Sequence, residues 1–244
     1  MLVTIAMPAF DEAQNVAKVA GEALMALAEA GGDGELLIVD DGSTDGTSEI
    51  VDTFAAQHAH VRVVRHRTNR GFSGAMTTSL REARGDWVFL VPADGQIVMR
   101  DLERFLAVRN AADIVVGVRA HRPERIGRKL LSRAFHRIAK TLFPVPLAEF
   151  SSVFLFRRAL VDAMPIRSRP RSATFLPEVL YRANARDARF VQLLIEPRPR
   201  MGGRAKGAQL SVALFTLLEL VRLAPLVRWD EMRAARARAH AAAR

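Results

Sequence analysis

The sequence predicts an α/β fold with a doubly wound, mostly parallel sheet and helices on both of its faces. Short aliphatic runs alternate with segments of helical spacing, and the connections between them are short. This order is typical of parallel strands joined by crossover helices. Half of the 244 residues are apolar, which is enough to bury one substantial core.

The first half of the chain predicts five strands that alternate with four helices. The helix at 15–29 has Val16, Val19, Ala23 and Leu27 at helical spacing, and two glycines follow it. The other elements are predicted from the same kinds of pattern. Strands are expected at 2–7, 36–39, 61–64, 87–91 and 114–117, and the remaining helices at 47–57, 72–83 and 100–110.

The pattern changes beyond about residue 120. We expect a basic helix over 126–143, a short apolar segment at 153–156, a helix around 176–181 and a strand at 190–195. An apolar stripe then predicts a C-terminal amphipathic helix, too short in its apolar run to span a bilayer, which either docks on the core or lies in a membrane interface. The stripe consists of Leu210, Ala213, Leu214, Leu217, Leu218 and Val221.

Charge is distributed unevenly along the chain. Residues 1–94 hold 7 Lys and Arg against 14 Asp and Glu, whereas residues 95–244 hold 29 against 12. A basic half attracts nucleic acid, an anionic membrane or a phosphorylated substrate, and a coding bias toward Arg and Ala also contributes to the excess. We expect no nucleic-acid partner, because acidic residues follow three strands and aromatic residues for stacking are sparse.

The chain contains no cysteine. Disulfides and thiolate metal sites are therefore excluded, and this composition fits a reducing cytoplasm. The first residues predict a strand rather than a signal peptide, so we expect a cytoplasmic protein.

Polar side chains follow three predicted strands at the points where these strands end. Glu12 follows the first strand, Asp40 and Asp41 follow the second, and Asp94 and Gln96 follow the fourth. Ligands bind outside the carboxyl ends of strands in open α/β sheets, so we expect one pocket there, with Glu12 and Asp41 accepting hydrogen bonds from a nucleoside. The carboxylate and amide oxygens after the fourth strand suit a hard divalent cation.

Each of these loops also has a simpler interpretation. Asp45 is expected to cap the following helix, and Pro8 ends a strand as proline commonly does. Asp94 with Gly95 would, if it stood alone, be an ordinary turn. The coincidence of three polar loops at one edge of the sheet is what favours a ligand site.

Together these stretches resemble family 2 glycosyltransferases with a GT-A fold, and within them the polyprenyl-phosphate sugar synthases of the dolichol-phosphate mannose type. The resemblance covers residues 1 to about 207. It rests on Pro8-Ala9-Phe10-Asp11-Glu12, Val39-Asp40-Asp41-Gly42-Ser43-Thr44-Asp45, Asn69-Arg70-Gly71, Ala93-Asp94-Gly95-Gln96, Gly117-Val118-Arg119 and Arg200 to Lys206. It implies transfer of a hexose from a nucleotide-diphosphate sugar to an acceptor, with inversion.

This resemblance also implies a domain organisation. Residues 1–207 would form the GT-A domain, with a nucleotide-binding half at 1–119 and an acceptor-side half at 120–207. Residues 208–244 would add the amphipathic helix and a basic Ala/Arg tail.

The family places the donor pocket in the first two loops and a metal ion in the third. Pro92 stands where the family has the first aspartate of its Asp-x-Asp motif, so we expect Mg²⁺ or Mn²⁺ to bind less tightly here. The implied nucleotide contacts are Pro8, Ala9, Phe10, Glu12, Val39, Asp41 and Ala93, and the implied metal ligands are Asp94 and Gln96.

The basic residues favour a phosphate as acceptor. A hydroxyl acceptor needs a general base, whereas a phosphate is already an anionic nucleophile and needs cations to position it. The positions where the family binds phosphate hold Arg119, Arg133, Arg200 and Lys206, which with Asp94 make up the expected catalytic set. We expect a polyprenyl-phosphate acceptor and peripheral contact with the inner face of the plasma membrane through the C-terminal helix.

Two other functions fit parts of the sequence. Glu149 lies in a segment where the family has an aspartate, so it is a candidate base for a hydroxyl acceptor, either a glycan or a small molecule. Pro92 and the basic half are also compatible with a non-catalytic nucleotide-binding protein.

Overall fold

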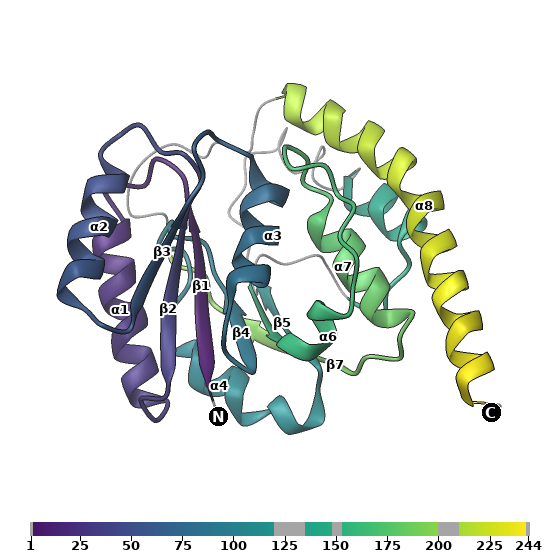
Figure 1. Cartoon of the computed structure of the whole chain (residues 1–244), viewed down its shortest axis with the longest axis horizontal. Helices are drawn as coiled ribbons and strands as arrows, with labels where there is room; N and C mark the ends of the chain where they lie inside the picture. The colour runs from purple at the N-terminus through teal and green to yellow at the C-terminus, as the bar shows by residue number, and fades with distance from the viewer. Residues whose placement is uncertain (1, 120–134, 148–152, 200–209, 243–244) are drawn as a thin grey trace.

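The computed structural model describes residues 2–119, 135–147, 153–199 and 210–242 and shows a seven-stranded sheet with helices on both faces (Figure 1). The strand order is β3-β2-β1-β4-β6-β5-β7. Six of the seven strands are mutually parallel. The strands are β1 (Val3–Ala9), β2 (Gly34–Asp40), β3 (Val61–Arg65), β4 (Trp87–Leu90), β5 (Ile114–Arg119), β6 (Phe154–Arg157) and β7 (Phe190–Ile195).

The predicted strands are confirmed as β1 to β5 and β7, and the predicted doubly wound arrangement is confirmed with them. The aliphatic runs of β1, β2 and β4 are buried on both faces of the sheet. Continuous apolar sequence is what a parallel strand covered by helices on both sides requires. The carboxyl ends of these three neighbouring strands therefore meet at one edge.

The strand β6 is the one departure from parallel order in the described sheet. It pairs antiparallel with both β4 and β5. The sequence predicted only an apolar segment here, because such a run fits a strand of either direction. In the structure Phe154, Leu155 and Phe156 are all fully buried.

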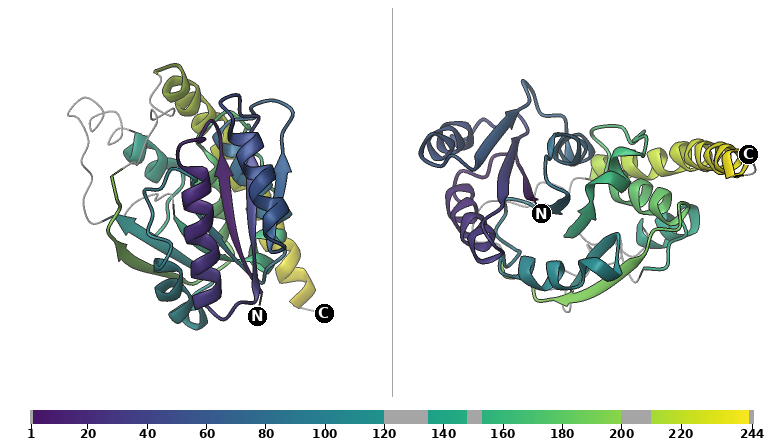
Figure 2. Two further views of the ribbon diagram at one scale, coloured as in Figure 1. Left: turned by 90° about the vertical axis from the view of Figure 1, so that its left-hand side faces the viewer. Right: turned by 60° about the horizontal axis from the view of Figure 1, so that its bottom comes forward.

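Helices cover the two faces of the sheet in two groups (Figure 2). One face is packed by α1, α2 and α4, and the other by α3, α6, α7 and α8. The labelled helices are α1 (Val16–Glu29), α2 (Thr47–Gln57), α3 (Phe72–Glu82), α4 (Asp101–Ala107), α6 (Arg158–Asp162), α7 (Phe175–Asn184) and α8 (Leu210–Ala242), and residues 135–142 are also helical.

One predicted helix is shorter than expected, one helix was not predicted, and one prediction falls only partly within the described residues. The helix predicted at 100–110 ends at Ala107 and is followed by a 3₁₀ turn over Arg109–Ala111. The sequence did not predict α6, which has five residues and is too short to show a periodic pattern. The basic helix predicted at 126–143 is helical over 135–142, and its first part lies outside the described residues.

The C-terminal helix α8 docks on the core through a face that the sequence analysis did not identify. Leu220, Leu223 and Val227 are fully buried, whereas Leu218 and Val221 of the predicted stripe are 64% and 62% exposed. Both faces of this helix are apolar, so periodicity could not choose between them. None of the described helices combines the length and the apolarity needed to cross a bilayer.

Candidate functional site

Three loops meet at the carboxyl ends of β1, β2 and β4. The amide of Asp41 donates a hydrogen bond to the carbonyl of Ala9 at 2.8 Å, and the amide of Ala93 donates to the carbonyl of Pro8 at 3.2 Å. These two bonds continue the β1–β2 and β1–β4 pairings beyond the ends of the strands. The loops that carry Glu12, Asp41 and Asp94 therefore lie side by side at one edge of the sheet.

The first two loops are also joined by side chains. Asp11 adopts a left-handed backbone conformation with φ 47°. Its amide donates to Ser43 Oγ at 2.9 Å, and its carboxylate accepts from the amide of Thr44 at 2.7 Å. The amide of Glu12 donates to Thr47 Oγ1 at 2.8 Å. These reciprocal bonds fix the first loop against the start of α2.

Glu12 and Asp45 occupy different positions in this arrangement. The Glu12 side chain is 8% exposed and accepts a hydrogen bond from Asn15 Nδ2 at 2.7 Å. Asp45 accepts from the amide of Thr47, the first residue of α2, at 3.1 Å. The N-cap position of α2 is Gly46 rather than Asp45, so Asp45 bonds to the first helical residue from one position before the predicted cap.

Asp40, the last residue of β2, holds the backbone and side chains beneath the loops together. Its fully buried side chain accepts hydrogen bonds from Ser48 Oγ at 2.5 Å, from the amide of Ser43 at 3.0 Å and from Arg65 Nε at 3.0 Å. Burial raises the pKa of this carboxyl, but the bonds from Ser48, Ser43 and Arg65 outweigh burial and hold the pKa below its ordinary value. Asp40 therefore stays ionised and structural.

Asp41, the second carboxylate, organises the neighbouring loop. It accepts hydrogen bonds from the amides of Arg70 and Gly71 at 2.8 and 2.9 Å. His66 Nδ1 lies 2.6 Å from Asp41 Oδ1, and His66 Nε2 lies 2.9 Å from Thr78 Oγ1. The sequence analysis did not identify His66 or Thr78, although His66 directly follows β3 at the same edge of the sheet.

Two glycines allow the backbone segments at this edge to approach one another. Gly42 has φ +72°, and a Cβ atom there would lie 2.6 Å from the amide nitrogen of Asn69. Gly71 has φ +83°, and a Cβ atom there would lie 2.7 Å from the Cα atom of Arg171. Larger residues would be strained at both positions and would push the loops apart.

The third loop carries the predicted metal ligands. The amide of Gln96 donates to Asp94 Oδ1 at 3.1 Å, so a tight turn places the two residues together. The amide of Arg198 donates to the carbonyl of Gln96 at 2.8 Å. That bond places the segment after β7 beside the third loop, although the two are about a hundred residues apart in sequence.

The donor set of this turn suits a divalent cation. Asp94 and Gln96 are both partly exposed at the sheet edge, and they offer carboxylate and amide oxygens, which Mg²⁺ and Mn²⁺ accept. Within the described residues, no group of three His, Cys, Asp or Glu residues is placed to hold a metal ion. Among the described residues, Asp94 and Gln96 therefore need further ligands to complete the coordination of a cation.

The remaining predicted site residues fall into three groups. Pro8, near the end of β1, and Phe10, on the first loop, are partly exposed, whereas the side chains of Ala9, Val39 and Ala93 are buried. Arg119 is the last residue of β5, at the same edge. Outside the described residues lie Arg133, Glu149, Arg200 and Lys206.

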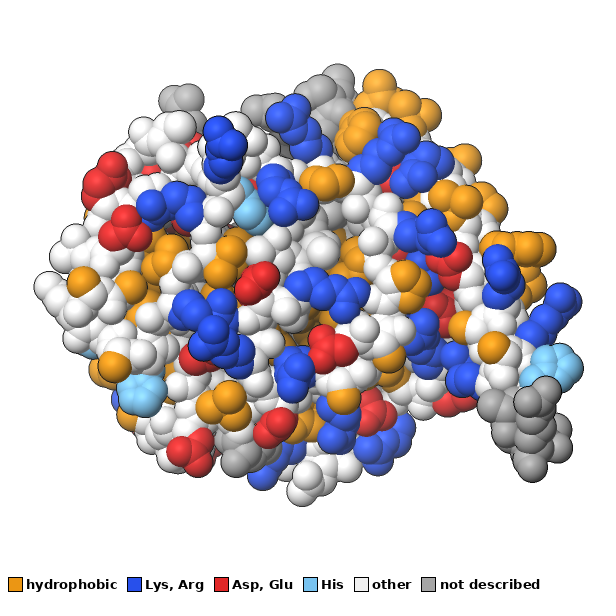
Figure 3. Space-filling view, in the orientation of Figure 1, with side chains coloured by type: hydrophobic (Ala, Val, Ile, Leu, Met, Phe, Trp, Pro, Cys, Tyr) orange, Lys and Arg blue, Asp and Glu red, His pale blue; other side chains and the backbone are white. Residues whose placement is uncertain are grey.

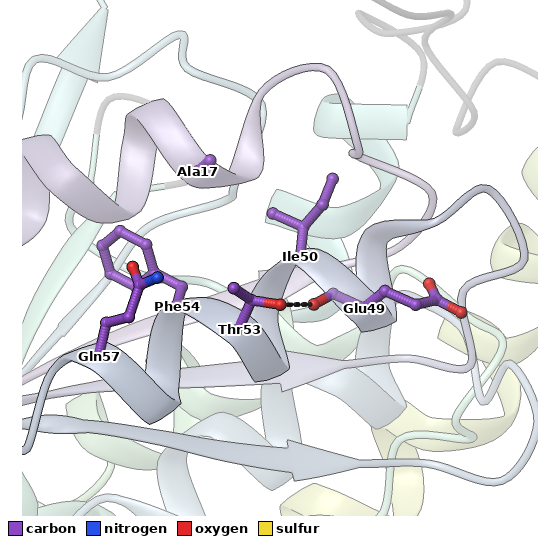
Figure 4. A pocket seen from close by; sticks show the side chains of 6 residues that line it. All are labelled: Ala17, Glu49, Ile50, Thr53, Phe54 and Gln57. Carbon is purple, nitrogen blue, oxygen red and sulfur yellow. Dashed lines mark hydrogen bonds between the residues drawn. The ribbon is translucent and has the colours of Figure 1, made fainter.

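A separate hollow lies between α1 and α2 (Figure 4). Its lining is Ala17, Glu49, Ile50, Thr53, Phe54 and Gln57. Thr53 Oγ1 bonds to the carbonyl of Glu49 in its own helix, and Glu49 supplies the one carboxylate. No set of polar groups converges on this hollow, so it is no competitor to the three loops.

The model of the family described as "Glycosyl transferase family 2" matches residues 4–165. The chain is 27% identical over 227 residues to the undecaprenyl-phosphate 4-deoxy-4-formamido-L-arabinose transferase of Pectobacterium atrosepticum, covering 92% of this chain and 68% of that protein. It is 26% identical over 211 residues to the dolichyl-phosphate beta-glucosyltransferase ALG5C of Trichomonas vaginalis, covering 79% and 63%. The chain thus spans about two thirds of the length of these relatives.

Solved structures show the same fold. Glucosyl-3-phosphoglycerate synthase from Mycobacterium tuberculosis, with Mn²⁺, UDP-glucose and phosphoglyceric acid, aligns with a TM-score of 0.67 at 18% identity, covering 92% of this chain and 80% of that chain. S. aureus TarS 1-349 with UDP-GlcNAc aligns with a TM-score of 0.61 at 18% identity, covering 93% and 66%. At these identities the alignments establish the architecture.

Proposed function

The chain belongs to glycosyl transferase family 2, whose model matches more than half of it, and from this premise we propose transfer of a hexose from a nucleotide-diphosphate sugar to a polyprenyl phosphate. The protein is a glycosyltransferase with a GT-A fold. The observation that carries the proposal is the meeting of three polar loops at the carboxyl ends of β1, β2 and β4. This edge is where nucleotides bind in open α/β sheets.

The donor would bind across the first two loops. Phe10 is partly exposed and would flank the base, while Glu12 and Asp41 would accept hydrogen bonds from the nucleoside. The hydrogen bonds from Arg70, Gly71 and His66 hold Asp41 in place before the donor arrives. A preformed acceptor loses less conformational entropy on binding. The solved structures that share this fold hold UDP-sugars, which supports this choice of donor class.

The diphosphate would lie over the third loop. Asp94 and Gln96 would hold Mg²⁺ or Mn²⁺, and this ion would stabilise the charge of the departing nucleotide diphosphate. One neighbour of the same fold was crystallised with Mn²⁺, which supports a divalent ion of this kind. Pro92 in place of a second carboxylate predicts weaker metal binding than two carboxylates would give.

The acceptor phosphate would attack the anomeric carbon of the sugar. One phosphate oxygen forms the new bond to that carbon, and the electron pair of the broken bond leaves with the nucleotide diphosphate, so the anomeric configuration inverts. The phosphate needs no protein base. Arg119 at the end of β5, with Arg133, Arg200 and Lys206, would position the two phosphate groups. Relatives named for undecaprenyl and dolichyl phosphates support this acceptor class.

A polyprenyl acceptor lies in a bilayer, so we also propose that the protein works as a peripheral protein at the cytoplasmic face of the membrane. The alternative acceptor is a hydroxyl group, with Glu149 as the base. Both alternatives share the donor site and differ in what receives the sugar. They are therefore separated by the acceptor experiment.

The full chain is incubated with radiolabelled UDP-, GDP- or dTDP-sugars, with undecaprenyl phosphate in detergent, and with Mn²⁺, Mg²⁺ or EDTA. We expect label in the lipid fraction with one nucleotide class and less transfer in EDTA. Transfer only to soluble glycans, lost in Glu149→Gln, would replace the lipid phosphate with a hydroxyl acceptor. Nucleotide binding without any transfer would indicate a non-catalytic protein.

His66 is expected to set the affinity for the donor through Asp41. Replacing His66 by alanine removes a hydrogen bond to a carboxylate, which is worth roughly 1.5–3 kcal/mol, and so loosens Asp41 and the loop at Arg70. We expect the Kd for the nucleotide, measured by calorimetry, to rise about tenfold. The kcat at saturating donor should change much less, since His66 touches no reacting atom.

Two controls accompany this substitution. His60→Ala alters an exposed histidine just before β3 and should leave the Kd unchanged. His66→Asn keeps a nitrogen donor for Asp41 and should restore most of the affinity. An unchanged Kd in His66→Ala would show that Asp41 needs no such support.

A further inference from the structure

The helix α8 has a second apolar face that points away from the core. Leu214, Leu218, Val221, Trp229 and Met232 are between 52% and 64% exposed. Their spacing of four, three, eight and three residues places them on one line along the helix. The buried side chains of α8 lie on the opposite side of the helix, so this exposed line forms an apolar surface that is separate from the core.

The acidic residues of α8 all face inward. Glu219 and Glu231 are 2% and 4% exposed. Glu231 accepts hydrogen bonds from Arg182 at 2.9 Å, and the half-buried Asp230 pairs with Arg167 at 2.6 Å. None of these carboxylates is left to neutralise charge on the outer surface of the helix.

The outer surface of α8 is therefore apolar and positively charged (Figure 3). Arg233 and Arg236 are exposed and make no ion pair within the described part of the chain. Arg228 is also exposed, and its guanidinium donates to the carbonyl of Leu142 at 2.8 Å. An apolar stripe flanked by arginines is typical of a helix that lies in the interface of an anionic bilayer.

The start of α8 lies close to the candidate site. Thr216 Oγ1 accepts a hydrogen bond from the amide of Ala173 at 3.2 Å, and the adjacent Ser172 carbonyl accepts from the amide of Ser73 at 3.1 Å. Ser73 lies in the first turn of α3, two residues after Gly71, which is bound by Asp41. The apolar stripe therefore begins at the end of the molecule where the three loops meet (Figure 1).

We propose that the outer face of α8, formed by Leu214, Leu218, Val221, Trp229 and Met232 with the flanking arginines, docks on an anionic lipid bilayer. The apolar side chains would enter the boundary between headgroups and acyl chains, and the arginines would contact lipid phosphates. A second copy of this chain is a poorer occupant, because its own α8 would bring arginines against arginines.

The proposed function supplies only the reason for this docking, which is to bring the three loops to a lipid acceptor. Vesicle binding is measured without donor or acceptor, so the two can fail separately. Vesicle binding with no sugar transfer would contradict the proposed acceptor alone. Transfer to detergent-solubilised undecaprenyl phosphate with no vesicle binding would contradict the docking surface alone.

The full chain is sedimented with vesicles of phosphatidylcholine, with or without phosphatidylglycerol. We expect binding to the anionic vesicles that is at least tenfold weaker in a variant with Leu214→Ser, Leu218→Ser and Val221→Ser. Arg233→Ala and Arg236→Ala should each weaken it about fivefold. The matched control carries Met25→Ser and Leu194→Ser, two residues 61% and 65% exposed elsewhere on the surface, and should bind like the parent protein.

Two results would overturn the proposal. One is equal binding by the triple variant and the parent protein. The other is that the parent protein forms a dimer in sedimentation equilibrium, that the triple variant does not, and that neither protein binds vesicles. This result would assign the outer face of α8 to contact with a second copy of the chain. All of these substitutions are at exposed positions, so circular dichroism should show unchanged folding.

Discussion

Asp94→Asn is expected to lower the rate of sugar transfer by at least about 100-fold, the effect usually seen when an electrostatic group at the departing charge is removed. Asp94 is the one carboxylate in the loop that follows β4. Pro92 stands where a second acidic residue would otherwise contribute to cation binding. The amide of the variant keeps the shape and a neutral oxygen but loses the negative charge that attracts a cation. The loss should appear in kcat, with excess Mn²⁺ restoring little.

The matched control for this prediction is Asp33→Asn. Asp33 is exposed in the turn before β2, at the opposite edge of the sheet from the three loops. Its replacement removes one negative charge from the same half of the chain and should leave transfer unchanged. An Asp94→Asn protein with the parental rate would remove the third loop from the donor site.

Arg182→Met is expected to lower the free energy of unfolding by about 3–5 kcal/mol, the usual result of removing one partner from a buried cluster of ion pairs. Arg182 is fully buried in α7. Its guanidinium donates hydrogen bonds to Glu178, Asp230 and Glu231, each at 2.9 Å. Methionine fills the space of the stem but cannot compensate the charges, so two buried glutamates would lose a shared partner.

Urea unfolding measures this loss, and Arg104→Met provides the control. Arg104 is half-exposed and pairs with Asp101 on the surface at 2.8 Å, so its removal should cost no more than about 1 kcal/mol. Equal stability of the Arg182→Met and Arg104→Met proteins would show that the buried cluster does not hold α8 to the domain.

The first half of the fold could be predicted from sequence because each of its elements carries a local signal. Buried parallel strands need unbroken aliphatic runs, and their crossover helices need an apolar face. The strand β6 lacked a signal for its direction, since antiparallel pairing with β4 and β5 depends on how the chain returns after residues 120–152. The sequence left open whether the apolar stripe of α8 faces the core, because the helix is apolar on two sides. In the structure Leu217 packs against the core, whereas Leu214, Leu218 and Val221 are exposed.

The loops at the sheet edge could be predicted to meet, but their internal contacts could not. The sequence does not distinguish the roles of the two aspartates after β2. In the structure the Asp40 carboxylate is hydrogen-bonded to Ser43, Ser48 and Arg65 and serves to hold the fold together. His66 acts through partners 12 and 25 residues away, and Arg182 pairs with Asp230 and Glu231, 48 and 49 residues away, as well as with Glu178 in its own helix. No local pattern in the sequence records the distant pairs. The roles assigned to Asp94, Arg119 and the other site residues remain predictions.

A short series of hydrogen bonds connects α8 to Asp41. Arg169 donates its amide to Glu219 of α8 at 3.1 Å, and the carbonyl of Pro170 accepts from Gly74 of α3 at 2.9 Å. Gly71, at the start of that helix, donates its amide to Asp41. A tilt of α8 against the body would therefore break one of these hydrogen bonds or displace Asp41, so the orientation of the helix and the position of this carboxylate are coupled.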